Sequence, residues 1–270
     1  MTTKSLTIGI FDSGVGGLSV LHHIREALPA AHLIYVADSG HVPYGDKSAE
    51  YIAQRAECLT CFLLEQGADA IVIACNTATA AAAASLRAKF DVPIIGMEPA
   101  VKPAVAATRT GVVGVLATVG TLESARFAAL LEKYAGNVEI VTQGCPGLVE
   151  CVERGDLHSS ATRELVAKYT TPLLQKNADT LILGCTHYPF LAPLIREIAG
   201  PKITLVDTGA AVARELKRRV EVELPHLTPV RDCAASEAFW TSGDATVAGR
   251  IISQLWHGDI TVQCLPSGNL

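Results

Sequence analysis

One segment occurs twice in the sequence, as GADAIVIACNT at residues 67–77 and as NADTLILGCTH at residues 177–187. The two copies keep an Ala-Asp pair and a cysteine in register at an offset of 110 residues. In each copy a short apolar run stops at a small residue and a cysteine, a pattern typical of a buried strand. Each strand is therefore expected to carry a thiol, Cys75 or Cys185, at its carboxyl end.

Strands and helices alternate on both sides of these two segments. Further apolar runs of strand type lie at residues 6–11, 33–37, 92–97, 110–117, 138–142 and 203–207. Helical patterns separate the runs, including one helix expected to continue from about Thr121 to Tyr134. This alternation favours an α/β fold with mainly parallel sheets and a site at the carboxyl ends of the strands.

The pattern restarts after Pro99, which predicts two similar three-layer α/β domains related by pseudo-twofold symmetry. The first domain would comprise residues 1–98 and 208–270, and the second would comprise residues 99–207. The last residues, with a strand-like run at 238–241 and a helix to about Trp256, are expected to return to the first domain. The active site would then lie in the cleft between the domains.

Composition excludes several classes of partner. Of the 270 residues 49% are hydrophobic and only 5% aromatic, which indicates an aliphatic core. A net charge of −5 provides no basic surface, so nucleic acid is not an expected partner. No apolar run approaches the roughly 20 residues that span a bilayer, and no signal peptide is recognisable. We expect a cytoplasmic protein without membrane contact, assembled as a homodimer.

The first predicted strand ends in a glycine-rich loop, DSGVGGLS at residues 12–19. A glycine loop after a strand suggests dinucleotide binding, and Asp38 stands at the end of the next strand. However, the third glycine position of that motif is Ser19, and Asp12 would place a carboxylate where a pyrophosphate must lie. A tight turn explains the glycines but not the Asp12-Ser13 pair. Nicotinamide binding is therefore disfavoured.

The eight cysteines are expected to be thiols in a reducing compartment, with Cys58 and Cys61 serving as core packing. Cys75 precedes a helix start, where backbone N–H groups should lower the pKa of a thiol. Cys185 should be placed likewise, with His187 two residues later. The pair could be a redox disulfide, or Cys185 and His187 could form a hydrolase nucleophile and base. A third possibility is inversion of a carbon centre, which needs an acid on one face and a base on the other.

Four segments together resemble the signatures of the glutamate racemases, in the cofactor-independent aspartate/glutamate racemase superfamily. They are DSGVGGLSV at 12–20, PYG at 43–45, ACNTA at 74–78 and GCTHYP at 184–189. The resemblance spans nearly the whole chain. It implies interconversion of L- and D-glutamate to supply D-glutamate for peptidoglycan, with neither pyridoxal phosphate nor a metal as cofactor.

The resemblance also implies the roles of individual residues. Cys75 and Cys185 would be the two acid/bases, with Cys75 acting on D-glutamate and Cys185 on L-glutamate. Asp12 would assist Cys75, and His187 would assist Cys185. A catalytic-side glutamate is expected eight positions after Cys145, at Glu153. Substrate contacts would come from Asp12, Ser13, Pro43, Tyr44, Gly45, Asn76, Thr77, Thr118, Thr121, Thr186 and His187.

Structural roles remain open for three of these residues at the sequence level. Asp12 could cap a turn, His187 could orient its loop, and Glu153 could be a solvated carboxylate on a helix face. Two features depart from the family pattern. Glu150 stands where an apolar residue or proline is expected, one helical turn from Glu153. The N-terminal extension of members activated by a cell-wall precursor is also missing, so that regulation is not expected.

Other functions remain open on the same residues. The same fold could racemise aspartate or a hydantoin, or decarboxylate a malonate. A protein that binds an amino acid or inhibits an enzyme without catalysis is a further alternative. A panel of substrates distinguishes these other reactions from glutamate racemisation. Isotope exchange at the α-carbon distinguishes a catalyst from a protein that only binds.

Overall fold

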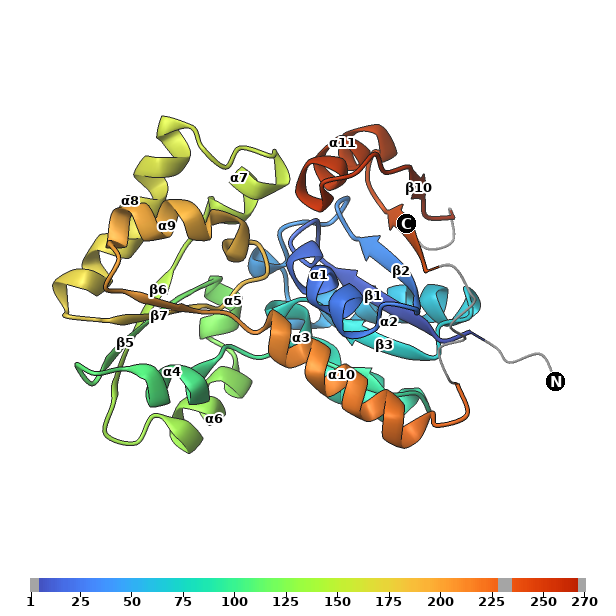
Figure 1. Ribbon diagram of the computed structural model, residues 1–270, viewed down its shortest axis with the longest axis horizontal. Coiled ribbons are helices and arrows are strands. Elements are labelled where there is room, and N and C mark those ends of the chain that lie inside the picture. The colour runs from blue at the N-terminus through green and yellow to red at the C-terminus, as the bar shows by residue number, and fades with distance from the viewer. Residues whose placement is uncertain (1–4, 228–234, 267–270) are drawn as a thin grey trace.

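The computed structural model describes residues 5–227 and 235–266, and it contains two parallel sheets (Figure 1). The larger sheet has the strand order β10-β9-β2-β1-β3-β4. Its strands are β1 (Thr7–Asp12), β2 (His32–Ala37), β3 (Ala70–Ile73), β4 (Ile94–Ile95), β9 (Ser236–Thr241) and β10 (Val262–Cys264). The smaller sheet has the order β6-β5-β7-β8. Its strands are β5 (Val112–Ala117), β6 (Glu139–Gly144), β7 (Thr180–Leu183) and β8 (Thr204–Val206).

Each sheet lies between helices, so the predicted α/β class with parallel sheets is confirmed (Figure 1). The helices around the larger sheet are α1 (Leu18–Ala27), α2 (Ala49–Glu65), α3 (Asn76–Lys89), α10 (Gly209–Glu223) and α11 (Ala245–Trp256). Those around the smaller sheet are α4 (Val101–Ala107), α5 (Val119–Leu122), α6 (Ala125–Tyr134), α7 (Leu148–Glu153), α8 (Ser160–Gln175) and α9 (Ala192–Ala199). Two 3-10 turns, η1 (Tyr44–Asp46) and η2 (Tyr188–Leu191), lie near the boundary between the two halves.

The repeated segment forms equivalent structures in the two halves. β3 and β7 begin and end at positions 110 residues apart, and both pair with the central strand of their sheet. The residue that precedes each Ala-Asp pair adopts a left-handed conformation, with φ of 87° at Gly67 and 64° at Asn177. Glycine and asparagine are the residues that tolerate this conformation at a helix end. The sequence echo therefore encodes a helix end, a turn and a buried strand.

Several elements differ from those expected. The helix predicted to continue to Tyr134 is two helices, α5 and α6, because Ser124 begins a new helix by accepting a hydrogen bond from Phe127 N at 3.1 Å. The run at 92–97 yields only the short edge strand β4, since Pro93 has no N–H to donate. α4, α9 and β10 were not predicted. β9 pairs in parallel with β2, so the end of the chain completes the first sheet.

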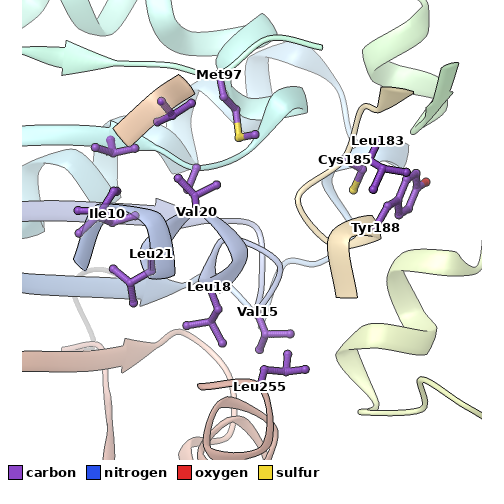
Figure 2. Close-up of a cluster of buried hydrophobic side chains, with 14 of the residues drawn as sticks. Ile10, Val15, Leu18, Val20, Leu21, Met97, Leu183, Cys185, Tyr188 and Leu255 are labelled. Atoms are coloured by element: carbon purple, nitrogen blue, oxygen red, sulfur yellow. The ribbon is translucent and has the colours of Figure 1, made fainter. Parts of the chain in front are cut away.

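The largest hydrophobic cluster contains side chains from both halves. Figure 2 shows members of this cluster from both halves, with Leu183, Cys185 and Tyr188 of the second half on the right and Leu18 and Leu21 of α1 on the left. This continuity holds the ends of β1 and β7 next to each other. Among the helices in the described residues, none is long and apolar enough to cross a membrane.

Candidate active site

Loops that follow β1, β3 and β7 enclose a small cavity at the boundary between the halves. Twelve residues line it: Ser13, Pro43, Tyr44, Gly45, Cys75, Asn76, Thr77, Thr118, Val149, Cys185, Thr186 and His187. All except Val149 belong to the set named from the sequence. Val149 was missed because an apolar residue in a short apolar helix carries no chemical signal. Asp12, Thr121 and Glu153 lie outside this lining and reach it through hydrogen bonds.

Cys75 lies at the start of α3, as its sequence context predicts. Its Sγ accepts a hydrogen bond from Ala78 N at 3.4 Å and lies 4.0 Å from Ser13 Oγ. The expectation of a lowered thiol pKa is wrong for this residue. Burial and the nearby Asp12 raise the pKa of Cys75 well above its usual value, and they outweigh the helix N–H group that lowers it. This raised pKa favours the protonated thiol at Cys75.

Asp12 ends β1 and is completely buried. Its Oδ2 accepts hydrogen bonds from Gly17 N at 2.7 Å and from Thr186 Oγ1 at 3.3 Å, and its Oδ1 accepts one from Ser13 Oγ at 3.3 Å. Burial raises the pKa of Asp12, although the positive charge of His187 opposes this. The carboxyl group does cap the glycine turn. It also accepts hydrogen bonds from Ser13, which lies beside Cys75, and from Thr186, which follows Cys185. A residue that only capped the turn would not make contacts on both sides of the cavity.

Cys185, His187 and Glu153 form a chain of polar contacts in the second half. Cys185 Sγ lies 3.6 Å from His187 Nδ1, and His187 Nε2 lies 2.6 Å from Glu153 Oε1. Burial would lower the pKa of His187, but its hydrogen bonds with Cys185 and Glu153 raise it well above the usual value. An imidazolium is thus held beside Cys185. The hypothesis that Glu153 is a solvated helix-face carboxylate is wrong.

The glycine loop makes room for this chain of contacts. A Cβ at Gly14 would lie 1.9 Å from Glu153 Oε1, and a Cβ at Gly16 would lie 2.3 Å from His187 Nδ1. The same loop donates a hydrogen bond from Val15 N to Glu153 Oε1 at 2.7 Å. The glycines therefore permit the second half to approach the end of β1. This contact explains them without a bound dinucleotide.

Polar groups near Cys75 are arranged to receive a ligand. Both polar atoms of the Asn76 amide are buried without a hydrogen-bond partner among the described residues. Thr77 Oγ1 lies 3.0 Å from Thr118 Oγ1 and 3.2 Å from Thr121 Oγ1, across the boundary between the halves. Buried amides rarely stay unpaired in proteins. Asn76 and this threonine cluster are consequently suited to hold a polar substrate.

Glu150 lies outside the cavity that contains the cysteines. It lines an adjoining pocket that shares Pro43, Gly45, Thr118 and Val149 with the first. Its carboxyl group is therefore near the site but not among the groups around the thiols. Glu150 stood out in the sequence because an apolar residue or proline is expected at its position. In the structure it lies in a pocket next to the site.

The fold and the cavity together define a class of protein. Two parallel-sheet halves each place one thiol in the same cavity, and each thiol has different polar partners. This is the arrangement that an isomerase with two acid/base groups requires. A hydrolase would leave Cys75 without a role.

Comparison with known proteins identifies the family. The model of the Asp/Glu/Hydantoin racemase family matches residues 8–216. A glutamate racemase of Methylococcus capsulatus is 59% identical over 268 residues, covering 99% of this chain and 98% of the relative. The chain belongs to this family, and its full-length relatives are glutamate racemases.

Solved structures agree with this assignment. The crystal structure of Escherichia coli glutamate racemase in complex with L-glutamate and activator UDP-MurNAc-ala has a TM-score of 0.86 at 33% identity, covering 97% of this chain and 98% of that one. The structure of glutamate racemase from Francisella tularensis in complex with D-glutamate has a TM-score of 0.83 at 27% identity, with coverage of 97% and 98%.

Proposed function

We propose that this protein interconverts L- and D-glutamate by proton transfer at the α-carbon between two cysteines. The observation that supports this most strongly is the single cavity lined by both Cys75 and Cys185. The high identity to glutamate racemases over nearly the whole chain supports glutamate as the substrate. In bacteria the product D-glutamate would serve peptidoglycan synthesis, as it does in the family.

In the proposed reaction, one thiolate takes the α-proton from one face of glutamate. The electron pair of the broken C–H bond spreads onto the α-carboxylate, and the other thiol returns a proton to the opposite face. Cys75 acts on D-glutamate and Cys185 on L-glutamate. Donors at the strand ends, such as the Asn76 amide, stabilise the charge that develops on the carboxylate.

Two different groups would assist the thiols. Asp12, whose pKa is raised by burial, would accept and return the proton of Cys75 on its side of the cavity. On the other side, the imidazolium of His187 beside Cys185 would stabilise the thiolate form, with Glu153 holding the imidazolium. The two halves are similar in fold, but the thiol that acts on D-glutamate and the thiol that acts on L-glutamate would have different assisting groups.

The substrate contacts are proposed for the polar groups of the lining. Ser13, Asn76, Thr77, Thr118, Thr121 and Thr186 supply hydroxyl and amide groups, and Pro43, Tyr44 and Gly45 supply the loop above the thiols. The domain boundaries near residues 98 and 208 are part of the same proposal, supported by the division of the strands between two sheets. Action in the cytoplasm would keep these thiols reduced. The homodimer stays a prediction.

The test is to follow the circular dichroism of L- and of D-glutamate with the purified protein, without added pyridoxal phosphate or metal. Both solutions should approach the same racemic end point. In deuterated water the α-position of the product should carry deuterium from the solvent. Glutamate binding without isotope exchange would contradict catalysis, and turnover of aspartate but not glutamate would contradict the substrate.

A further inference from the structure

The loop between β2 and α2 covers the cavity and contacts both halves. Tyr44 and Gly45 line the cavity. Gly45 also packs against the second half, where a Cβ at Gly45 would lie 3.2 Å from Thr118 Cβ and one at Gly120 would lie 3.1 Å from Gly45 O. η1 is the only regular element between residues 38 and 48. The position of this loop therefore depends on side-chain contacts.

A buried polar chain connects the loop to α2. Tyr44 Oη donates a hydrogen bond to Asp38 Oδ2 at 2.5 Å. Arg55, from α2, donates to the same carboxylate twice, from Nε to Oδ2 at 3.0 Å and from Nη2 to Oδ1 at 2.7 Å. The exposed fractions are 1% for Tyr44, 0% for Asp38 and 8% for Arg55. The three side chains thus form one buried unit at the end of β2.

This unit is also connected to the backbone of the site. Asp38 N donates a hydrogen bond to Asp12 O at 3.0 Å. The backbone of Asp38, whose carboxylate holds Tyr44, is therefore fixed to the last residue of β1. Burial raises the pKa of the Tyr44 phenol, which therefore remains the donor to Asp38. A planar guanidinium fits a carboxylate with two parallel hydrogen bonds, which an ammonium group does not.

We propose that Arg55 is a positioning residue for substrate binding, which fixes the cavity loop at Pro43–Gly45 through Asp38 and Tyr44. Arg55 does not line the cavity, and its effect on the cavity loop would pass through Asp38 and Tyr44. The proposal rests on the proposed function, because the loop is taken to contact glutamate. Cys75 and Cys185 are held by other elements, so Arg55 should govern the affinity for glutamate more than the rate of proton transfer.

The experiment compares Arg55→Met, Arg55→Lys and Tyr44→Phe with a matched control, Thr60→Val. Thr60 is also buried on α2, but its hydroxyl bonds Ala56 O within the helix. We expect Arg55→Met to raise KM for both enantiomers about ten-fold or more, the change that corresponds to the loss of a strong hydrogen bond. kcat of Arg55→Met should change less than about three-fold. KM of Arg55→Lys should lie between that of the wild type and that of Arg55→Met. Thr60→Val should leave KM unchanged.

Tyr44→Phe removes only the phenol group and keeps the ring and the Arg55–Asp38 pair. It should raise KM in the same direction, and the double variant should be no worse than Arg55→Met because both act through one chain. If Arg55→Met does not fold, the Tyr44→Phe result decides. An unchanged KM in Tyr44→Phe, or a fall in kcat at constant KM, overturns the proposal.

A second measurement does not depend on racemisation. Amide hydrogen exchange at residues 38–46 should be faster in Arg55→Met and Tyr44→Phe than in the wild type, while α8 keeps its protection. Exchange in the loop equal to that of Thr60→Val contradicts the positioning role. If the wild type does not racemise glutamate, the proposed function fails, and hydrogen exchange still decides whether Arg55 fixes the loop.

Discussion

His187 is held as a cation by contacts on both of its ring nitrogens. Nδ1 faces the Cys185 thiol, and Nε2 faces Glu153, which is fixed in turn by the N–H of Val15. Because the ring is buried, solvent contributes little to its charge state. The raised pKa of His187 therefore depends on its hydrogen bonds with Cys185 and with the Glu153 anion.

Replacing Glu153 with glutamine removes this anion but keeps an oxygen that can accept from Val15 N. The pKa of His187 is raised in the wild type, so activity that needs the imidazolium is present below that pKa and lost above it. In Glu153→Gln the pKa falls, and the alkaline limb of kcat for L-glutamate should move down by about one pH unit. At pH values above the wild-type pKa, kcat of the variant should be about ten-fold lower than that of the wild type at the same pH.

The matched control is Glu150→Gln on the same helix. Glu150 lines the adjoining pocket, whose lining does not include His187, so this variant should keep the wild-type pH profile. An alkaline limb at the same pH in Glu153→Gln and wild type would show that His187 does not act as an imidazolium. NMR titration of the His187 ring gives an independent measure of its pKa.

At the level of single residues, most of the cavity lining could be predicted from motifs. Residues that follow neighbouring parallel strands meet at one edge of a sheet, so Ser13 and Asn76 could be placed together, and the expected cleft between the halves placed Thr186 opposite them. The pKa of Cys75 could not be predicted, because it depends on burial and on the distance to Asp12. Arg55 gave no signal either, since its partner lies 17 residues earlier in the chain.

At the level of elements, the aspartates of the repeated segment have one structural role in both halves. Asp69 Oδ2 accepts from Thr7 N at 3.0 Å, at the start of β1. Asp179 Oδ2 accepts from Arg109 N at 2.8 Å and from Thr110 N at 3.1 Å, just before β5. Each aspartate therefore fixes the start of the central strand beside its own.

Asp179→Ala tests this role through stability. Burial would raise the pKa of Asp179, but hydrogen bonds from Thr108, Arg109 and Thr110 lower it to about 2, from an ordinary value of 3.8. The carboxylate thus contributes stability above pH 4, which is lost as the pH falls towards 2. We expect a loss of about 1–2 kcal/mol in the free energy of unfolding at pH 7, measured by urea titration.

The difference between Asp179→Ala and wild type should shrink below pH 4, because the wild-type carboxylate becomes protonated. The exposed Asp259 provides the control, and Asp259→Ala should change stability by less than about 0.5 kcal/mol. A pH-independent difference between Asp179→Ala and wild type would rule out the charge as its cause.

The boundary of a helix could be predicted where residues next to it in the sequence carry the start or stop signal. α2 begins directly after Ser48, whose side chain caps the helix by accepting a hydrogen bond from Tyr51 N. α4 and α9 were missed because both are short. β10 was missed because three residues at a sheet edge have little periodicity, and it is identified only by pairing with β9.

At the scale of the whole molecule, the two halves share a hydrophobic cluster and enclose a small cavity between them. The sequence predicted two α/β units and a site between them because its repeat was long enough to recognise. It could not predict that Glu153 and His187 pack against the glycine loop of the other half. That contact depends on how the halves are placed, which no local pattern encodes.

The central claim is that each half supplies one proton carrier, and single alanine variants test it most directly. Cys75→Ala and Cys185→Ala should each abolish racemisation of both enantiomers, measured by circular dichroism. Cys61→Ala, a half-buried thiol on α2, should retain wild-type activity. Full racemisation by either Cys75→Ala or Cys185→Ala would contradict the two-thiol mechanism.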